Sequence, residues 1–351
     1  MKHLIKFITV CSLLATIIYF VTRIPSVHKD LRKNPTRLNA PISFHAVDSQ
    51  QFISTESMFS GMCPTLAKRP PAYSCNAPAL GRLHPVRHDE SKTFDCGAKK
   101  WIDLGGAVRS AAPHLYHLLD DRHRLLPMCT SSVKSDTVVD HGYMSFISRT
   151  LTARHVRRGF VIDVGASTGK TTLVASVLGY QVIAFEASKV LAELLSRTVL
   201  MNSVESLVTV FQNGVADGVY TGTLAAAQDE TALPLVTIVC LDSLVPYLNV
   251  LDLPKVVTLL KIDVANLEPL VLRGATTFFA EYDVRTIFLE MRGDHWLELG
   301  CPPSAVATTL FKMDYVMSSH DGSLVSNKHE FERWYKKNKK KRSASIVFQK
   351  V

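Results

Sequence analysis

The sequence lacks the features that mark several familiar classes of protein. No Cys-x-x-Cys pair occurs, which argues against a zinc finger or ribbon, and we predict no metal site. No internal repeat is visible, which argues against a solenoid or a propeller. Aromatic residues are not interleaved with basic ones, so we expect no nucleic-acid partner. No Asn-x-Ser/Thr sequon is present, because Asn34 is followed by proline, so glycosylation gives no sign of the compartment.

What the chain does have is the composition of a globular protein with a basic excess. Apolar residues make up 47% and charged residues 20% of its 351 residues, so wholesale disorder is not expected. Much of the net charge of +9 lies at the two ends, where the start is basic and Lys336–Arg342 is one run. Such a run is most often a solvated helix end, and a clamp for a phosphorylated or sulfated glycan is the alternative.

The start of the chain has the pattern of a membrane anchor. The apolar stretch Phe7–Val21 has basic residues on both sides, and no small-x-small cleavage site follows it. We therefore predict a single-pass signal anchor over residues 1–24 and a Pro-containing stem over residues 25–60. The flank after the anchor is at least as basic as the flank before it, so a cytosol-facing orientation stays open. A mitochondrial presequence is the third possibility, because few acidic residues occur before Glu56.

Cysteines favour the lumen of the endoplasmic reticulum or Golgi over these alternatives. Four of them, Cys63, Cys75, Cys96 and Cys129, lie in a Pro-rich extension over residues 61–150. That number suits two disulfides with three possible connectivities, and four separate buried thiols are the alternative. Two further cysteines in the following domain, Cys240 and Cys301, are expected to be structural. Helices are predicted in the extension near Ser110–Leu126 and Tyr143–Val156.

From Gly159 the sequence alternates short apolar runs with one-faced helical patterns. Continuous Val, Ile and Leu runs are typical of a parallel sheet that is covered on both faces. We therefore predict a doubly wound α/β domain of the Rossmann type, with a mostly parallel sheet, over residues 151–351. The predicted strands are Phe160–Val164, Gln181–Phe185, Leu207–Phe211, Val236–Leu241, Val256–Val264, Val284–Leu289, Tyr315–Ser318 and Ala344–Phe348. The predicted helices of this domain are Thr171–Leu178, one capped by Ser188 that ends near Asn202, and Leu267–Phe278.

A glycine-rich turn follows the first strand of this domain, where open α/β sheets bind their ligands. Gly165 and Gly169 allow a sharp bend and a close approach of the backbone around Ala166. Free N–H groups at the next helix suit a carboxylate, and Asp163 suits an ammonium group. A P-loop would need its first glycine at position 164, which is Val164. A dinucleotide-binding fingerprint that starts at Gly165 would need glycines at positions 167 and 170, which are Ser167 and Lys170. The methionine half of S-adenosylmethionine fits the turn best.

Three polar residues after the second and third strands complete the predicted cofactor site. Glu186 ends the second strand, where a carboxylate can accept hydrogen bonds from both ribose hydroxyls of an adenosine. An ordinary strand-end carboxylate is the alternative for this residue. Asn213 and Asp217 follow the third strand and could reach the adenine ring, although loops are rich in both residue types.

Together these segments resemble the FkbM-type methyltransferases. The stretch VIDVGASTGKTTLVASVLGYQVIAFEAS is similar to the family's opening pattern, VIDVGANxGxxSxxxAxxGxxVxAFEPxP. The likeness covers about residues 155–295. It continues through Asn213–Asp217 (NGVAD), Thr237–Leu244 (TIVCLDSL), Leu259–Val264 (LLKIDV), Glu268, Leu272–Ala275 (LRGA) and Ile287–Glu290 (IFLE).

The resemblance implies methyl transfer from S-adenosylmethionine, usually to an oxygen, on a small-molecule or glycan acceptor such as a sugar or lipid. Four residues are candidates for orienting or deprotonating the acceptor: Asp263, Lys261, Glu290 and His295. Lys261 could instead pair with a carboxylate, and His295 could be an ordinary loop histidine. The family's Glu-Gly pair is replaced by Ala265-Asn266, and two prolines after Glu186 are missing. A scaffold that keeps the fold and has lost the chemistry is therefore the alternative function.

Overall fold

The structure, a computed structural model, describes ten stretches of the chain, all within the compact unit Ser54–Val351. The predicted anchor lies outside the described residues, as does almost all of the stem. No helix among the described residues is long and apolar enough to cross a membrane. The described residues are 58–64, 75, 82–86, 114–119, 125–130, 141–153, 159–223, 235–319, 324–338 and 344–351.

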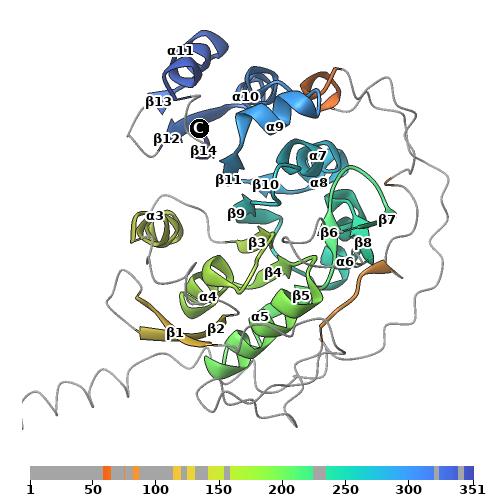
Figure 1. The fold of residues 1–351 in the computed structure, drawn as a ribbon, viewed down its shortest axis with the longest axis vertical. Coiled ribbons are helices and arrows are strands. Elements are labelled where there is room, and N and C mark those ends of the chain that lie inside the picture. Colours follow the sequence, from red (N-terminus) through yellow and green to blue (C-terminus); the bar gives the residue numbers. More distant parts are fainter. Residues whose placement is uncertain are drawn as a thin grey trace, which may run out of the picture. The chain divides into compact units, whose positions relative to one another are not determined.

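A nine-stranded sheet forms the centre of this unit (Figure 1). Five neighbouring strands are parallel, and β14 is antiparallel to both of its neighbours, which confirms a mostly parallel sheet. In spatial order the strands are β13 (Leu324–Val325), β12 (Tyr315–Ser319), β14 (Ala344–Lys350), β11 (Thr286–Met291), β9 (Val256–Ile262), β3 (Phe160–Val164), β4 (Val182–Phe185) and β5 (Val208–Phe211), with β10 (Asp283–Val284) paired to β9.

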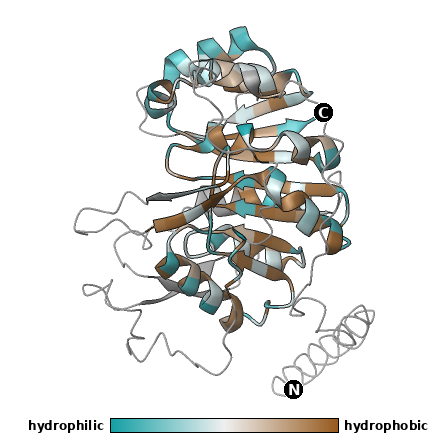
Figure 2. Cartoon of the chain, turned by 90° about the vertical axis from the view of Figure 1, so that its right-hand side faces the viewer, coloured by the Kyte–Doolittle hydropathy of each residue, from teal (hydrophilic) through white to brown (hydrophobic). Residues whose placement is uncertain are grey.

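Both faces of the sheet are buried, because successive side chains of a strand point to opposite sides. In β3, Phe160 and Ile162 belong to one apolar cluster, and Val161 belongs to the other. Figure 2 shows apolar residues along the strands and polar residues on the outer helices. The helices of the first face are α3 (His141–Thr152), α4 (Lys170–Val177) and α5 (Lys189–Met201). Those of the second are α6 (Val245–Val250), α7 (Glu268–Arg273), α8 (Thr276–Glu281), α9 (Gly293–Glu298), α10 (Pro303–Phe311) and α11 (Lys328–Asn338), with the 3-10 helices η2 (Ser60–Met62) and η5 (Leu241–Leu244).

The doubly wound domain is therefore confirmed, and several of its predicted boundaries are correct to within a residue or two. The Ser188 hydroxyl caps α5 by accepting a hydrogen bond from Leu191 N, and Asn202 ends the helix. The predicted helix Leu267–Phe278 is instead two helices. The chain breaks at Gly274, where a Cβ would lie 2.3 Å from Ala216 O.

Two predictions about strands and helices were wrong. The strand predicted over Val236–Leu241 is β8 (Leu235–Val239), which belongs to a separate three-stranded sheet with β6 (Gly214–Val215) and β7 (Tyr220–Thr223). The helix predicted near Ser110–Leu126 is wrong for the described part of that stretch, which forms two antiparallel strands, β1 (His114–Leu119) and β2 (Leu125–Thr130). A strand depends on a partner for its hydrogen bonds, and a local pattern does not show that partner. The helix predicted near Tyr143–Val156 is α3.

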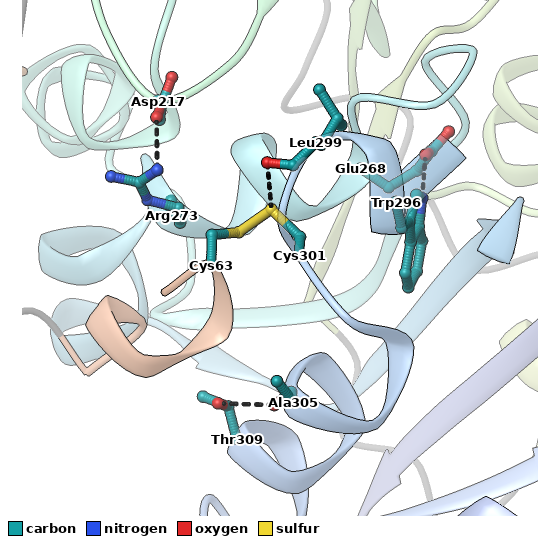
Figure 3. The surroundings of a disulfide bond; sticks show 9 residues. All are labelled: Cys63, Asp217, Glu268, Arg273, Trp296, Leu299, Cys301, Ala305 and Thr309. Atoms are coloured by element: carbon teal, nitrogen blue, oxygen red, sulfur yellow. Dashed lines mark hydrogen bonds and ion pairs between the residues drawn. A yellow bond between two sulfur atoms is a disulfide. The ribbon is translucent and has the colours of Figure 1, made fainter. Parts of the chain in front are cut away.

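The two disulfides do not join the extension to itself, as the cysteine count suggested. Cys63 is bonded to Cys301 and Cys75 to Cys240, with sequence separations of 238 and 165 residues. Figure 3 shows the first of them between η2 and the chain that follows α9. Cys96 and the side chain of Cys129 lie outside the described residues. Each disulfide therefore ties the extension to the methyltransferase-like domain, because their partners become neighbours only when the extension packs on that domain.

The extension also adds backbone hydrogen bonds at the free edge of β5. Pro85 forms an antiparallel bridge with Phe211, and Val86 N donates to Val210 O at 2.8 Å. Gln212 N donates to His84 O at 2.9 Å. An exposed edge strand invites pairing with other chains, and this short segment covers the edge.

We predict that loss of the Cys63–Cys301 disulfide lowers stability strongly, because the bond closes a very long loop. Cys63→Ser should cost about 2–5 kcal/mol and lower the thermal midpoint by roughly 5–15 °C. The measurement is calorimetric unfolding under non-reducing conditions. Cys63→Ser/Cys301→Ser is the control and should be no less stable than Cys63→Ser, since both lack the same bond. A single variant as stable as the wild type would contradict the prediction.

Candidate functional site: the carboxyl edge of the parallel strands

The glycine turn between β3 and α4 is held against two neighbouring strands. Gly165 N and Ala166 N both donate to Phe185 O at 2.9 Å, which fastens the turn to the end of β4. Gly165 has a φ of +78°, and a Cβ there would lie 1.9 Å from Asp263 O, beyond the end of β9. Glycine is therefore required at this position by contact with the protein itself.

Asp163 and Lys261 form a buried ion pair beneath the turn. Asp163 Oδ2 accepts hydrogen bonds from Thr172 N at 3.1 Å and Thr172 Oγ1 at 2.7 Å, which fixes the first turn of α4. Lys261 Nζ lies 3.2 Å from Asp163 Oδ1 and donates to Gly165 O. The pairing of Lys261 with a carboxylate is thereby confirmed. The ammonium group that Asp163 meets within the protein is that of Lys261, and its predicted contact with a cofactor stays a prediction.

Glu186 points back toward the glycine turn. Its Oε2 accepts a hydrogen bond from Ser167 N at 2.7 Å, and its Oε1 accepts one from Ser188 N at 2.9 Å. Burial raises the pKa of this carboxyl above its usual value, while the two backbone N–H groups and Lys261 act in the opposite direction. Each carboxylate oxygen has a second lone pair. Glu186 therefore has one acceptor position left on each oxygen, as recognition of a ribose diol requires.

Asn213 and Asp217 have partners within the protein, and their predicted role at the adenine stays a prediction. Asn213 Oδ1 accepts from His84 N at 2.9 Å, and its Nδ2 donates to Arg82 O and Thr237 O, both at 3.0 Å. This fully buried amide thus holds the extension against the core. Asp217 Oδ2 is 3.3 Å from Arg273 Nη1, an ion pair drawn in Figure 3.

The loop after β9 lies beside the glycine turn and has an unusual backbone. Ala265 and Asn266 have φ values of +53° and +91°, in the region that favours glycine. The fully buried Glu268 carboxylate stabilises this bend, because its Oε1 accepts from Val264 N at 3.0 Å and Asn266 N at 3.2 Å. Burial raises the pKa of Glu268. Asp263, at the start of the loop, is 41% exposed at its side chain and lies 3.9 Å from Lys261 Nζ.

The other two predicted catalytic residues have partners of their own. Glu290 Oε2 accepts a hydrogen bond from Ser345 Oγ at 2.7 Å. His295 lies on α9 with about half of its side chain exposed, and its Nδ1 is 3.3 Å from Glu298 Oε2. Among the described residues, neither side chain contacts the glycine turn through a hydrogen bond or ion pair, and both roles stay predictions.

Sequence reasoning missed a contact between the loops after β9 and β11. Trp296, fully buried on α9, donates from Nε1 to Glu268 Oε2 at 2.9 Å (Figure 3). The signal available was a tryptophan placed just beyond the strand that ends near Glu290. Its partner, however, is 28 residues away in the chain, so no local pattern identified it.

Comparison with known proteins gives one family match and several similar solved structures. Residues 163–321 match the family of the methyltransferase FkbM domain. No curated protein matches the chain significantly. One similar solved structure is a precorrin-6y C5,15-methyltransferase from Geobacter metallireducens, with 13% identity over 63% of this chain and 94% of that one and a TM-score of 0.33. Another is a methyltransferase from Agrobacterium tumefaciens, with 11% identity over 74% and 76% and a TM-score of 0.37.

A doubly wound sheet with this glycine turn and strand-end carboxylate defines the class of S-adenosylmethionine-dependent methyltransferases. Within that class, residues 163–321 of the chain are an FkbM methyltransferase domain, which confirms the resemblance and extends it past residue 295. The cofactor is therefore S-adenosylmethionine. The carboxylate of Glu186 fits it, since both of its oxygens keep an acceptor position for a ribose hydroxyl, whereas Asp163 Oδ1 is paired with Lys261 Nζ.

We predict that Gly165→Ala disrupts the site and the fold together. The new methyl group would overlap Asp263 O, and a positive φ is unfavourable for alanine. The free energy of unfolding should therefore fall by at least about 3 kcal/mol. Chemical denaturation measures this loss. Gly61→Ala is the matched control, because nothing lies within 4 Å of its added Cβ, and it should stay within about 0.5 kcal/mol of the wild type. Equal stability of the two variants would contradict the prediction.

We predict that Asn213→Ala weakens the fold and leaves cofactor affinity nearly unchanged. Three backbone groups, those of His84 N, Arg82 O and Thr237 O, would lose their partner, at a cost of about 2–4 kcal/mol. Thermal unfolding and titration with S-adenosylhomocysteine measure the two properties. Asn202→Ala is the control, because its side chain donates to Thr198 O four residues away, and it should cost less. Unchanged stability with lost affinity would instead assign Asn213 to the adenine.

Proposed function

We propose that the chain methylates a hydroxyl group of a small acceptor, such as a sugar or a lipid, with S-adenosylmethionine as the methyl donor. The observation that carries the proposal is the position of Glu186, whose carboxylate closes on the glycine turn and keeps acceptor positions for a ribose. The acceptor class follows from the family resemblance and from the partly exposed carboxylate of Asp263 beside that turn.

Asp263 is the best placed group to orient the acceptor hydroxyl. When bound, the cofactor would supply a methyl group from a positively charged sulfur, which would leave as a neutral thioether. Asp263 would orient the acceptor hydroxyl toward that methyl group, and the hydroxyl proton would pass to Asp263 or to water. Alignment is the main contribution of the protein. Lys261 is buried in its ion pair and acts by holding Asp163 and the turn.

The alternative function is a scaffold that binds the cofactor without methylating an acceptor. The replacement of the family's Glu-Gly pair by Ala265-Asn266 favours this alternative, because it removes a carboxylate beside the acceptor loop. Cofactor binding with no methyl transfer to any hydroxyl acceptor would support the scaffold. Transfer of a radioactive methyl group to a sugar or lipid fraction would exclude it.

We further propose a single-pass membrane protein whose domain lies in the lumen of the endoplasmic reticulum or Golgi. The apolar stretch Phe7–Val21 supports the anchor. The Cys63–Cys301 and Cys75–Cys240 disulfides support an oxidising compartment. Free thiols at these four cysteines in chain isolated from cells would contradict the luminal location.

We predict that Glu186→Ala lowers affinity for S-adenosylhomocysteine by at least about tenfold. The variant removes the charged acceptor of two hydroxyl hydrogen bonds, each worth roughly 1.5–3 kcal/mol. Calorimetric titration of the full-length chain in detergent measures the affinity. Glu205→Ala removes an exposed carboxylate and should bind like the wild type. Undiminished binding by Glu186→Ala would remove the support for the proposed cofactor site.

The same carboxyl gives the binding a pH dependence. Because burial raises its pKa above 4.5, Glu186 becomes protonated at a higher pH than an exposed glutamate, and affinity should fall through that window on acidification. The stability of the unliganded protein depends on pH in the opposite direction. The stability that protonated Glu186 contributes is present below pH 4.5 and is lost as the pH rises through the pKa of Glu186 in the folded protein. Glu186→Ala should lack both dependences.

A further inference from the structure

Two side chains beyond the ends of β9 and β11 have buried polar atoms without a partner. Asn266 Oδ1 and Arg292 Nε are each buried, and neither makes a hydrogen bond within the part of the chain that the structure describes. Most buried polar atoms in proteins are paired, so an orphan of this kind calls for a specific explanation. A bound molecule that supplies the missing hydrogen bonds is one such explanation.

The two residues lie on loops that one carboxylate joins. Glu268 accepts a hydrogen bond from Asn266 N through Oε1 and from Trp296 Nε1 through Oε2. Trp296 N in turn donates to Arg292 O at 3.1 Å, one helical turn away. The strands that lead into these loops are parallel neighbours, with Leu289 opposite Ile262. Asn266 and Arg292 therefore follow adjacent strands at the same edge of the sheet, beyond the glycine turn.

The backbone at Asn266 indicates that its side chain has a use. A φ of +91° favours glycine, and the family pattern that the chain resembles has glycine at this position. Asparagine is strained there, and strained residues cluster at binding sites. Its Oδ1 is an acceptor only, so it requires a donor, and a hydroxyl group of a ligand can supply one.

Arg292 is a charged donor with no counter-charge of its own. No ion pair links its guanidinium to a carboxylate among the described residues, although Glu290 and Asp294 are each two positions away in the sequence. Glu290 accepts a hydrogen bond from Ser345 Oγ, and Glu268 accepts one from Trp296 Nε1. Asp263 lies 3.9 Å from Lys261 Nζ. Burial raises the pKa of Tyr335, and the charge of Asp294 raises it further. The family's carboxylate at position 265 is an alanine here. Both features favour an anionic ligand.

We propose that Asn266 and Arg292 form an acceptor subsite for a molecule that carries an anionic oxygen group beside its hydroxyls. The guanidinium binds the carboxylate, phosphate or sulfate, and the Asn266 carbonyl accepts a hydrogen bond from a hydroxyl. Glu268 is the positioning residue that holds the two loops together. The inference rests on the proposed function and narrows its substrate class to acidic hydroxyl compounds.

The test uses the full-length chain in detergent, saturated with S-adenosylhomocysteine. The probes are D-glucuronate, glucose 6-phosphate, glucose 6-sulfate and neutral glucose, titrated by calorimetry. We expect at least one anionic probe to bind at least about tenfold more tightly than glucose, and the probe that does so identifies the anionic group. Arg292→Gln should abolish this preference, and Arg292→Lys should keep part of it.

Two further variants separate binding from folding. Asn266→Gly should weaken every sugar probe while its thermal midpoint stays equal to or above that of the wild type, because glycine relieves the positive φ. Arg333→Gln is the matched control, an exposed arginine on α11 whose loss should leave all probes unaffected.

The proposal is overturned if no anionic probe binds better than glucose, if none binds at all, or if Arg292→Gln keeps the full preference. Failure of the proposed function gives a different result. The wild-type chain would then either not bind S-adenosylhomocysteine, or bind the cofactor and an anionic probe without transferring a radioactive methyl group from S-adenosylmethionine to it.

Discussion

The close contact between the ends of β3 and β9 is the constraint on which the site depends. Gly165 approaches Asp263 O so closely that no side chain fits between them. Lys261, on β9, stabilises the contact, because its Nζ forms an ion pair with Asp163 and donates a hydrogen bond to Gly165 O. The contact sets the cofactor turn and the acceptor loop in fixed register, so the methyl donor and the proposed acceptor positions belong to one rigid edge of the sheet.

Two buried carboxylates then shape the two halves of this edge by the same means. Glu186 accepts one backbone N–H group from the cofactor turn and one from the N-cap residue of α5, and Glu268 accepts two within the acceptor loop. Burial raises the pKa of both groups, which is the electrostatic cost of placing a carboxylate where water is scarce. The hydrogen bonds that each one accepts offset part of that cost and order the loops before any ligand arrives.

The extension before the domain is a structural part of it. The described pieces of the extension belong to the same compact unit as the sheet. Disulfides at Cys63 and Cys75, together with the Asn213 amide, attach these pieces at separate points. Removal of the extension would expose the edge of β5 and the apolar surface under η2, where Phe59 and Met62 are fully buried. The domain from residue 151 onward therefore depends on the extension for part of its support.

Local pattern was sufficient for the strands and helices from Phe160 to Phe211, because each apolar run there is long, uniform and bounded by a glycine or a cap. The glycine turn and Glu186 were predictable for the same reason. Each follows a buried strand, and the carboxyl ends of neighbouring parallel strands lie at the same edge of the sheet. The sequence by itself thus determined the class of fold and the family's cofactor, and it predicted the edge of the sheet at which we propose that the cofactor binds.

Only the tertiary structure decided which distant residues meet. The partners of Cys63 and Cys75, the pairing of β1 with β2, and the contact of Glu268 with Trp296 all join positions that have no local relation in the sequence. Asn213 shows the same limit, because its amide contacts His84 N and Arg82 O of the extension and Thr237 O of β8, which the sequence pattern did not indicate. A hydrogen-bonding side chain binds whichever partner the completed packing brings within reach, and the sequence alone does not contain that distance.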